Sequence, residues 1–238
     1  MNSKQALAII RKIRGIYNTA NTDWDNTRQI PAGHKIKQLR FVKKGMKILD
    51  LGCGNGLMFP ELLKHGSTVV GFDISSSMLN LARKKFKNEI KDKKIKLILG
   101  SATKLPFKNN SFDGAVSFAV LHHIPSNELR LKFLQELWRV LKPKSTAVVV
   151  VWNLLNEWSD KRFKITEQLK TTGEPGDVLV PWKATKGKIL MRYMHQFSKK
   201  ELSSLAHQAG FKKITINYFT SAGIKQKNGE AMVLKMVK

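Results

Sequence analysis

The sequence predicts an α/β fold built on an open, Rossmann-like sheet with helices on both faces. Three observations lead to this prediction. Short apolar runs alternate with helical stretches along most of the chain. The first of these runs, 47–51, breaks into a loop with glycine at positions 52, 54 and 56. The second ends in Asp73, 21 residues after Gly52, which is the spacing at which Rossmann-type folds hold ribose hydroxyls.

Seven segments are expected to be strands, because each is a short run rich in β-branched, aromatic or other apolar residues. In chain order they are 47–51, 68–72, 95–99, 113–118, 146–152, 211–219 and 231–237. The run 146–152 is almost entirely apolar and is therefore expected to be buried on both faces.

Helices are expected between these strands. The glycine loop should open a helix over 57–63, and Ser75 or Ser76 can cap one that runs to about residue 88. Ser126 can cap a helix with an apolar stripe spaced by four, formed by Leu129, Phe133, Leu137 and Leu141. Near the C-terminus, Ser198 and Glu201 match a capping box.

Two segments lie outside this alternation. Residues 1–46 precede the first strand, and 153–197 is too long for a simple connection. We expect one domain over 1–238, with 1–46 as a helical cover and 153–197 as an insertion. Because open α/β sheets bind ligands at the carboxyl ends of their strands, both segments are assigned to substrate recognition.

Charge is the other prominent feature of the composition. The 238 residues include 43 Lys+Arg and only 17 Asp+Glu, a net charge of +26 spread over the whole chain. Such a field favours a polyanionic partner such as RNA. The alternative is a general lysine bias, since 34 of the basic residues are Lys. No apolar stretch approaches the ~20 residues of a membrane span, and no signal peptide is recognised, so a cytoplasmic location is expected.

The glycine loop indicates S-adenosylmethionine rather than a dinucleotide. A dinucleotide site requires G-x-G-x-x-G, whereas the spacing here is G-x-G-x-G. Asp50, just before the loop, would repel a phosphate but suits a cation, and S-adenosylmethionine carries a sulfonium and an ammonium. Residues 48–56 closely resemble the first motif of the class I S-adenosylmethionine-dependent methyltransferases. The alternative is a tight turn that holds no ligand.

That resemblance implies a seven-stranded sheet whose last strand is antiparallel and inserted between the fifth and sixth. It also implies which residues border the cofactor. These are Tyr17, Asp50, Gly52, Cys53, Gly54, Gly56, Asp73, Ile74, Ser101, Ala102, Phe118 and Ala119. Ser101 stands where many relatives have an acidic residue for the adenine amino group, so a weaker hydrogen bond is expected there.

Three side chains near the cofactor motifs are candidates for chemistry. His122 and His123 follow the fourth strand, and either could act as a general base. The alternative for each is a structural, hydrogen-bonded histidine. Cys53 is the only cysteine, which excludes an internal disulfide and a cysteine-cluster zinc site. It could be a nucleophile, but a small residue packed in the loop is the simpler interpretation.

Several stretches resemble one branch of the family, the eukaryotic wobble-uridine tRNA methyltransferases. They are IYNTA at 16–20, WDNTR at 24–28, VLHH at 120–123, VVVW at 149–152, DVLVPWK at 177–183 and RYMHQF at 192–197. That branch esterifies the carboxylate of 5-carboxymethyluridine, often together with a small zinc-binding activator protein. A carboxylate with a pKa of about 4 is already ionised at neutral pH, so its methylation needs no base.

The narrower resemblance also implies residues on the substrate side. Arg28 is the candidate for aligning the substrate carboxylate or a neighbouring phosphate. Aromatic and basic residues of the late motifs are candidates for holding the flipped base: Trp152, Trp182, Lys183, Arg192 and Tyr193. Two other functions stay open at this point. One is a small-molecule methyltransferase of the quinone or lipid-precursor type, and the other is an RNA-binding module with a defunct cofactor site.

Overall fold

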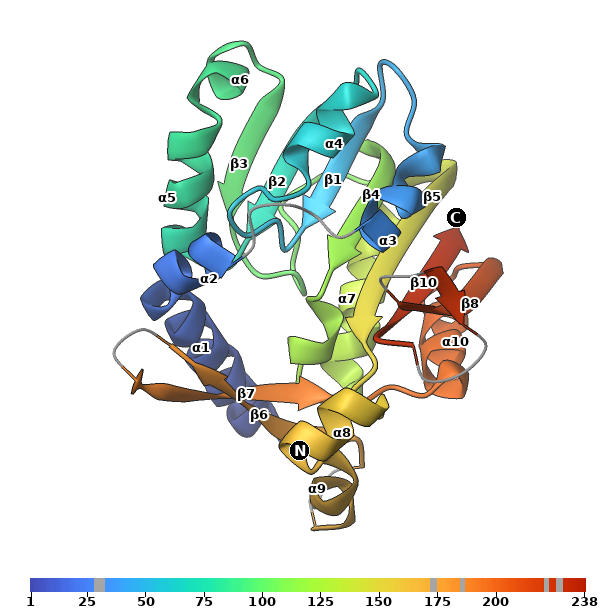
Figure 1. Ribbon diagram of the computed structural model, residues 1–238. Coiled ribbons are helices and arrows are strands. Elements are labelled where there is room, and N and C mark those ends of the chain that lie inside the picture. Colours follow the sequence, from blue (N-terminus) through green and yellow to red (C-terminus); the bar gives the residue numbers. More distant parts are fainter. Residues whose placement is uncertain (28–32, 172–174, 185–186, 221–222, 226–228) are drawn as a thin grey trace.

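The computed structural model describes residues 1–238 except 28–32, 172–174, 185–186, 221–222 and 226–228. Its centre is a mixed sheet with the strand order β3-β2-β1-β4-β5-β10-β8-β9 (Figure 1). The strands are β1 (Lys47–Leu51), β2 (Thr68–Asp73), β3 (Ile95–Leu99), β4 (Phe112–Phe118), β5 (Leu141–Trp152), β8 (Lys213–Thr220), β9 (Gly223–Lys225) and β10 (Ala231–Val237). All seven predicted strands are present, and β9 adds a three-residue strand at one edge.

Strand β10 is antiparallel and lies between β5 and β8. Val233 is paired with Val150 on one side and with Asn217 on the other. From β3 to β5, neighbouring strands are parallel. The α/β fold and the inserted last strand are therefore confirmed. Because parallel strands end at one edge of the sheet, the loops after β1, β2 and β4 meet there.

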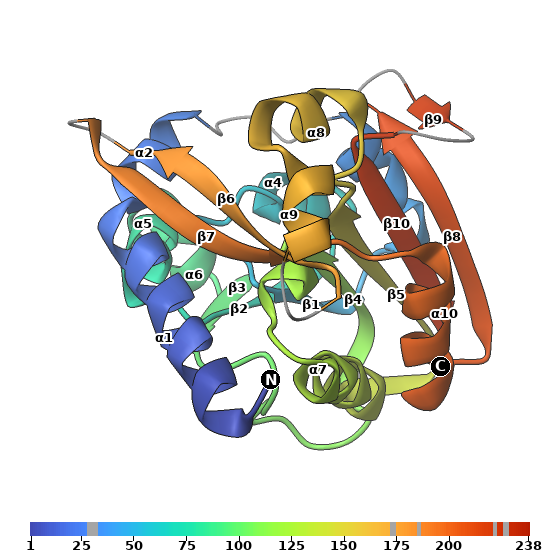
Figure 2. The ribbon, with the colours of Figure 1, turned by 90° about the horizontal axis from the view of Figure 1, so that it is seen from below.

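Helices cover both faces of the sheet (Figure 2). On one face lie α4 (Phe59–Lys64), α5 (Ser76–Lys85) and α6 (Lys87–Lys91), and on the other lie α7 (Asn127–Val140) and α10 (Lys199–Gln208). Phe59 and Leu79 belong to the first core, and Phe133 and Leu205 belong to the second. Complete burial of such a side chain contributes about 1.5–3 kcal/mol, so both layers hold the sheet rigid beneath the loops at its edge.

The helices differ from the predictions in three details. The helix predicted to reach residue 88 ends at Lys85, and α6 follows as a separate turn. The stripe on α7 consists of Phe133, Leu134, Leu137 and Val140, because a spacing of four drifts from the 3.6-residue period. The capping box of α10 is only half formed. Ser198 accepts from the backbone N–H of Glu201, but the Glu201 carboxylate bonds to His195 instead.

The two segments outside the sheet contain further elements. The N-terminal segment forms α1 (Ser3–Thr19), α2 (Asn21–Thr27), α3 (Gly33–Ile36) and the 3-10 helix η1 (Lys37–Phe41). The insertion forms α8 (Glu157–Phe163), α9 (Ile165–Thr171) and a separate hairpin of β6 (Asp177–Lys183) and β7 (Ile189–His195), which was not predicted. Figures 1 and 2 show α1 and the hairpin side by side at the carboxyl ends of the parallel strands. The insertion has a small core of its own, which includes Leu154, Ile165 and Val180.

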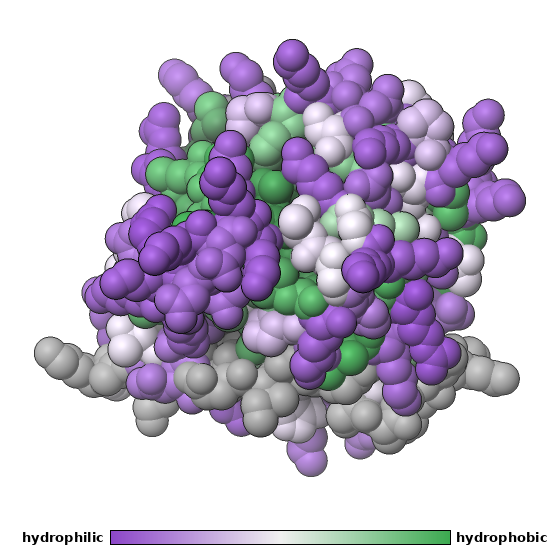
Figure 3. Space-filling view, turned by 90° about the horizontal axis from the view of Figure 1, so that it is seen from above, coloured by the Kyte–Doolittle hydropathy of each residue, from purple (hydrophilic) through white to green (hydrophobic). Residues whose placement is uncertain are grey.

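The opposite end of the sheet, where the parallel strands begin, is covered mainly by hydrophilic residues (Figure 3). Within the described residues, no helix combines the length and the apolar character that a membrane crossing requires.

Candidate active site

The glycine loop is pressed against its neighbours so closely that side chains would not fit. Gly52 has φ +79°, and a Cβ built there would lie 2.1 Å from a methyl carbon of Val120. Its N–H donates to the carbonyl of Phe72 at 2.7 Å, which holds the loop against the end of β2. A ligand at this edge therefore meets bare backbone.

Asp73 ties the glycine loop to the start of α5. One carboxylate oxygen accepts from Gly54 N at 2.8 Å and the other accepts from Ser75 N at 2.8 Å. Burial raises the pKa of Asp73 above its usual value, although these backbone N–H groups favour the ionised form. A carboxylate can accept about four hydrogen bonds, so Asp73 keeps capacity for ligand hydroxyls.

Asp50 is a buried carboxylate at the end of β1. It is 2% exposed, and Oδ2 has no hydrogen-bond partner among the described residues. Burial, together with the nearby charge of Asp73, raises its pKa to about 7, while Lys35 opposes this shift. Asp50 is therefore only partly ionised at neutral pH, and a cationic ligand would stabilise its ionised form.

A cavity opens at the carboxyl edge between these groups and helix α1. It is lined by thirteen of the residues proposed from the sequence: Tyr17, Asp50, Gly52, Cys53, Gly54, Asp73, Ile74, Ser101, Ala102, Phe118, Ala119, His123 and Trp152. Gly56 does not line it. A Cβ at Gly56 would lie 2.6 Å from Phe59 and from Phe86, so this glycine serves the turn. The hydroxyl of Ser101 is already bonded to that of Thr103 at 2.9 Å.

Sequence reasoning missed several lining residues. Ile10 and Ile13 come from α1, Lys35 comes from α3, and Val120 and Ile124 flank the two histidines. Ile10 and Ile13 belong to a short apolar run near the N-terminus, and such a run in a helix is expected to pack against the rest of the domain. The sequence therefore contained an indication of their position. Lys35 belongs to no motif and could not have been singled out.

The N-terminal helices are fastened over the cavity by polar contacts. The Ser75 hydroxyl donates to Asn18 Oδ1 at 2.7 Å, across 57 residues of sequence. Asp25 on α2 accepts from Asn55 Nδ2 in the glycine loop at 2.7 Å and pairs with Lys85 on α5. The glycine loop and α5 therefore bind the cover directly.

The two histidines have defined and different partners. The Nδ1 of His123 lies 2.9 Å from the carbonyl of Tyr193, which can only accept, so Nδ1 carries the proton and Nε2 accepts from the Tyr17 hydroxyl at 2.9 Å. The Nδ1 of His122 accepts from Trp152 N at 3.3 Å, which leaves the proton on Nε2. Burial lowers the pKa of His123 to about 3 and that of His122 well below 6.5. Both rings are therefore neutral, and neither has a free acceptor nitrogen.

Beside the cavity, the Arg192 guanidinium contacts two indole rings. Its Cζ lies 5.4 Å from the ring centre of Trp152 and 5.2 Å from that of Trp182. Trp182 in turn packs near Tyr17, with their ring centres 6.0 Å apart. Arg192 and Trp182 do not line the cavity, but Trp152 belongs to both groups and joins them.

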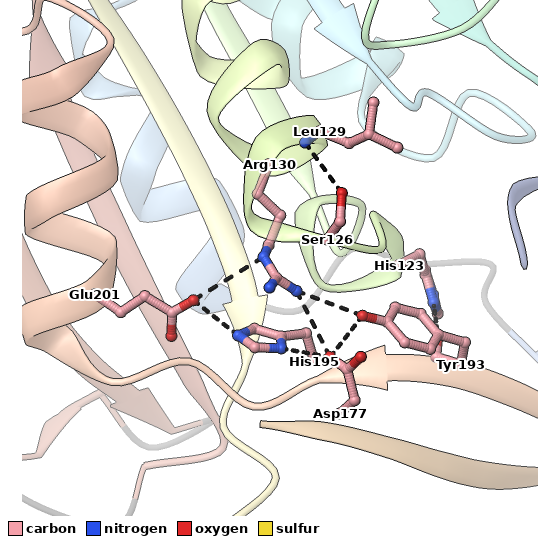
Figure 4. Close-up of polar contacts among 8 residues, drawn as sticks. All are labelled: His123, Ser126, Leu129, Arg130, Asp177, Tyr193, His195 and Glu201. Carbon is pink, nitrogen blue, oxygen red and sulfur yellow. Dashed lines mark hydrogen bonds and ion pairs between the residues drawn. The ribbon is translucent and has the colours of Figure 1, made fainter. Parts of the chain in front are cut away.

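Tyr193, the next residue, points into a buried polar network instead of the cavity (Figure 4). Its hydroxyl donates to Asp177 at 2.6 Å and lies 3.4 Å from an Arg130 nitrogen. His195 bridges Asp177 and Glu201 at 2.8 Å each, so both ring nitrogens donate and its pKa is raised, although burial alone would lower it. The network joins α7, the hairpin and α10, and it corrects the expectation that Tyr193 faces the substrate. The sequence had not singled out Arg130.

Two proposed residues cannot be placed. Arg28 lies outside the described residues. Lys183 pairs through its backbone with Ile189 in the hairpin, and its side chain lies outside the description.

The cavity residues fit S-adenosylmethionine on their own geometry. The closely packed glycine loop admits a ligand against its backbone, and Asp73 retains acceptor capacity for ribose hydroxyls. The unpartnered oxygen of Asp50 suits the positive charge of the methionine end.

Comparison with known proteins agrees with this fit. Residues 49–149 match the methyltransferase domain family. The mouse tRNA (carboxymethyluridine(34)-5-O)-methyltransferase ALKBH8 is 27% identical over 164 residues, which are 68% of this chain and 23% of that protein. Demethylmenaquinone methyltransferase of Lactococcus lactis is 32% identical over 149 residues, 58% of each chain. The chain spans only about a quarter of the length of the mouse relative.

Solved structures show the same architecture. An S-adenosylmethionine-dependent methyltransferase from Methanosarcina mazei superposes with a TM-score of 0.68 at 26% identity, over 85% of this chain and 96% of that one. The putative methyltransferase in a Haloferax volcanii complex with the Trm112 methyltransferase activator has a TM-score of 0.66 at 17% identity, over 94% and 96% of the two chains. Strand order, cofactor cavity and family match together place this chain among the class I S-adenosylmethionine-dependent methyltransferases.

Proposed function

We propose that the chain methylates RNA, and that its acceptor is the carboxylate of a wobble-uridine side chain in tRNA. One observation carries the choice of acceptor. His123 lines the cavity and His122 does not; both are neutral, and neither has an acceptor nitrogen free to take a proton. An acceptor that is already ionised fits such a site, whereas a hydroxyl or a carbon acid requires a base.

When bound, S-adenosylmethionine supplies an electrophilic methyl group, which a carboxylate oxygen takes while the sulfur keeps the bonding electron pair. The chain's residues would then have three tasks. Asp73 and the glycine loop hold the nucleoside, and Asp50 favours the cationic methionine end of the cofactor. Tyr17 and α1, which line the cavity, limit the access of water to it. Alignment of the two reactants supplies most of the rate enhancement expected here.

Two further observations support an RNA acceptor. The curated relatives named tRNA methyltransferases match 64–78% of this chain. The net charge of +26 suits a polyanion. The resemblance also implies a small zinc-binding activator as a partner, and methylation measured with and without such a protein would test this part of the proposal.

The test is incubation of the protein with methyl-labelled cofactor and either bulk tRNA or a lipid extract, followed by mild alkali treatment of the labelled tRNA. A carboxylate ester loses its label as methanol, whereas methyl groups on nitrogen, carbon or ribose oxygen stay on the RNA. We expect alkali-labile label on tRNA. Label that survives alkali, or that appears only in a lipid extract, would contradict the proposal.

The second candidate is a small-molecule methyltransferase of the quinone or lipid-precursor type. The similarity to demethylmenaquinone methyltransferase and the apolar contribution of Ile10 and Ile13 to the cavity favour it. The lipid-extract arm of the same experiment would detect it.

A further inference from the structure

Arg192 is a buried cation. It is 4% exposed, and its Nε has no hydrogen-bond partner among the described residues. None of the ion pairs formed within the described part of the chain includes it. Its guanidinium lies over the rings of Trp152 and Trp182, which attract a cation but offer its N–H groups no lone-pair acceptor.

Arg130 shows how this chain treats a comparable buried arginine. It is 6% exposed, and its Nε, like that of Arg192, has no hydrogen-bond partner among the described residues. The charge of Arg130 is nevertheless paired in the network of Figure 4, where Asp177 lies at 3.7 Å, Glu201 at 4.0 Å and the Tyr193 hydroxyl at 3.4 Å. The same hairpin that supplies Asp177 to Arg130 supplies no carboxylate to Arg192. An arginine needed only for packing would be replaced by an apolar residue at little cost, so the unpaired charge indicates a ligand.

His122 offers a second unsatisfied donor beside the same indole. The ring is fully buried, its centre lies 5.7 Å from that of Trp152, and its Nε2 has no partner among the described residues. Because Nδ1 accepts from Trp152 N, Nε2 must present an N–H. Two buried donors of different types therefore flank Trp152, which also lines the cofactor cavity.

We propose that Arg192 and His122 form an oxyanion subsite that holds the carboxylate of the acceptor next to the cofactor cavity. A guanidinium that lies over aromatic rings keeps its N–H donors, and a planar carboxylate can take two of them in a two-point contact. The subsite rests on the proposed function for the identity of the acceptor. A backbone phosphate would satisfy the same donors, and phosphate binding by Arg192 would contradict the proposal.

The first experiment measures RNA binding by calorimetry in the presence of S-adenosylhomocysteine. Two anticodon stem-loops are compared that differ only at the wobble side chain, carboxymethyl in one and the uncharged, isosteric carbamoylmethyl in the other. We expect the wild type to bind the acid at least tenfold more tightly. In Arg192→Met this preference should fall below twofold, and Arg192→Lys should keep part of it.

Arg162→Met is the matched control. Arg162 also lies over an indole, 5.3 Å from the centre of Trp158, but it is exposed on α8 and away from the cavity. It should retain the full preference. Equal binding of both RNAs by the wild type would overturn the proposal. A uniform loss of both RNAs in Arg192→Met would also overturn it, because Arg192 would then bind a phosphate.

A second experiment separates the subsite from the RNA proposal. Acetate and inorganic phosphate are titrated separately against tryptophan fluorescence, without RNA and at constant ionic strength. A saturable change with acetate that disappears in Arg192→Met and remains in Arg162→Met supports the subsite even if no RNA binds. No saturable change with acetate in the wild type, or a response to phosphate alone, would refute it.

Discussion

Replacement of Asp50 by asparagine should make the cofactor-free protein more stable and the cofactor complex weaker. Asp50 is fully buried, with a pKa of about 7 against a usual value of 3.8. At about 1.4 kcal/mol per pKa unit, its ionisation costs the folded state about 4 kcal/mol. Because the folded-state pKa lies above the unfolded one, the stability contributed by protonation is fully present below about pH 4 and is lost as the pH rises through about 7.

Asparagine has nearly the same shape and carries no charge at any pH. Asp50→Asn should therefore exceed the wild type in unfolding free energy by about 4 kcal/mol at pH 8 and by about 2 kcal/mol at pH 5, with no difference near pH 3. Urea unfolding without cofactor measures this. Asp113→Asn is a control of opposite sign, since Lys142 and the backbone N–H of Lys47 lower the pKa of Asp113 despite partial burial. It should destabilise most at high pH.

Calorimetry with S-adenosylmethionine supplies the other half of the test. The wild type should bind about tenfold more weakly at pH 6 than at pH 8, because a group with a pKa of about 7 must lose its proton to meet the cation. Asp50→Asn should bind at least tenfold more weakly than the wild type at pH 8, with little pH dependence. An Asp50→Asn protein less stable than the wild type at pH 8, or one with unchanged affinity, would refute the reasoning.

Three further predictions concern the cover, the nucleoside contact and the buried network. Asp73→Asn should weaken S-adenosylhomocysteine binding about 100-fold, because both carboxylate oxygens of Asp73 accept hydrogen bonds and the amide nitrogen of asparagine cannot. The control Asp113→Asn should stay within twofold of the wild-type affinity in calorimetry. Tyr17→Phe removes one hydrogen bond to His123 worth about 0.5–1.5 kcal/mol and should weaken the same ligand about 2- to 10-fold. His195→Leu breaks a buried charge network and should lower the unfolding free energy by about 3 kcal/mol at pH 6. At about 2–4 °C per kcal/mol, the melting temperature should fall by about 6–12 °C. The stability difference between His195→Leu and the wild type should shrink as the pH rises through the raised pKa of His195, because the wild type then loses the stabilisation that protonated His195 provides.

The fold and the cofactor side of the cavity could be predicted because both follow from local patterns. A continuous β-branched run such as 146–152 predicts a strand that is covered on both faces of an α/β sheet. The glycines after Asp50 predict a tight loop, because glycine readily adopts a positive φ. Chain topology then brings Asp50, Gly52 and Asp73 to one edge without further information.

The acceptor side could not be predicted, because it depends on contacts between distant segments. Nothing in the sequence near His123 shows that Tyr17, 106 residues away, takes its acceptor nitrogen. Arg192 and Tyr193 are neighbours in one motif, but successive strand residues face opposite sides, so one meets the indoles and the other meets Asp177. The motif alone gave both the same role.

Asp50 and Arg192 together suggest how the site distinguishes reactants from products. One is a buried carboxylate and the other a buried cation. Asp50 Oδ2 and Arg192 Nε have no hydrogen-bond partner among the described residues, although Lys35 acts on Asp50 and Trp152 borders both regions. A purely structural pair would have been brought together, as His195 and Asp177 are. A sulfonium donor and a carboxylate acceptor match this separation, and methyl transfer between them leaves a neutral thioether and a neutral ester. The two residues would therefore hold the reactants more strongly than the products, so that their main effects are on substrate binding and on product release rather than on the methyl transfer itself.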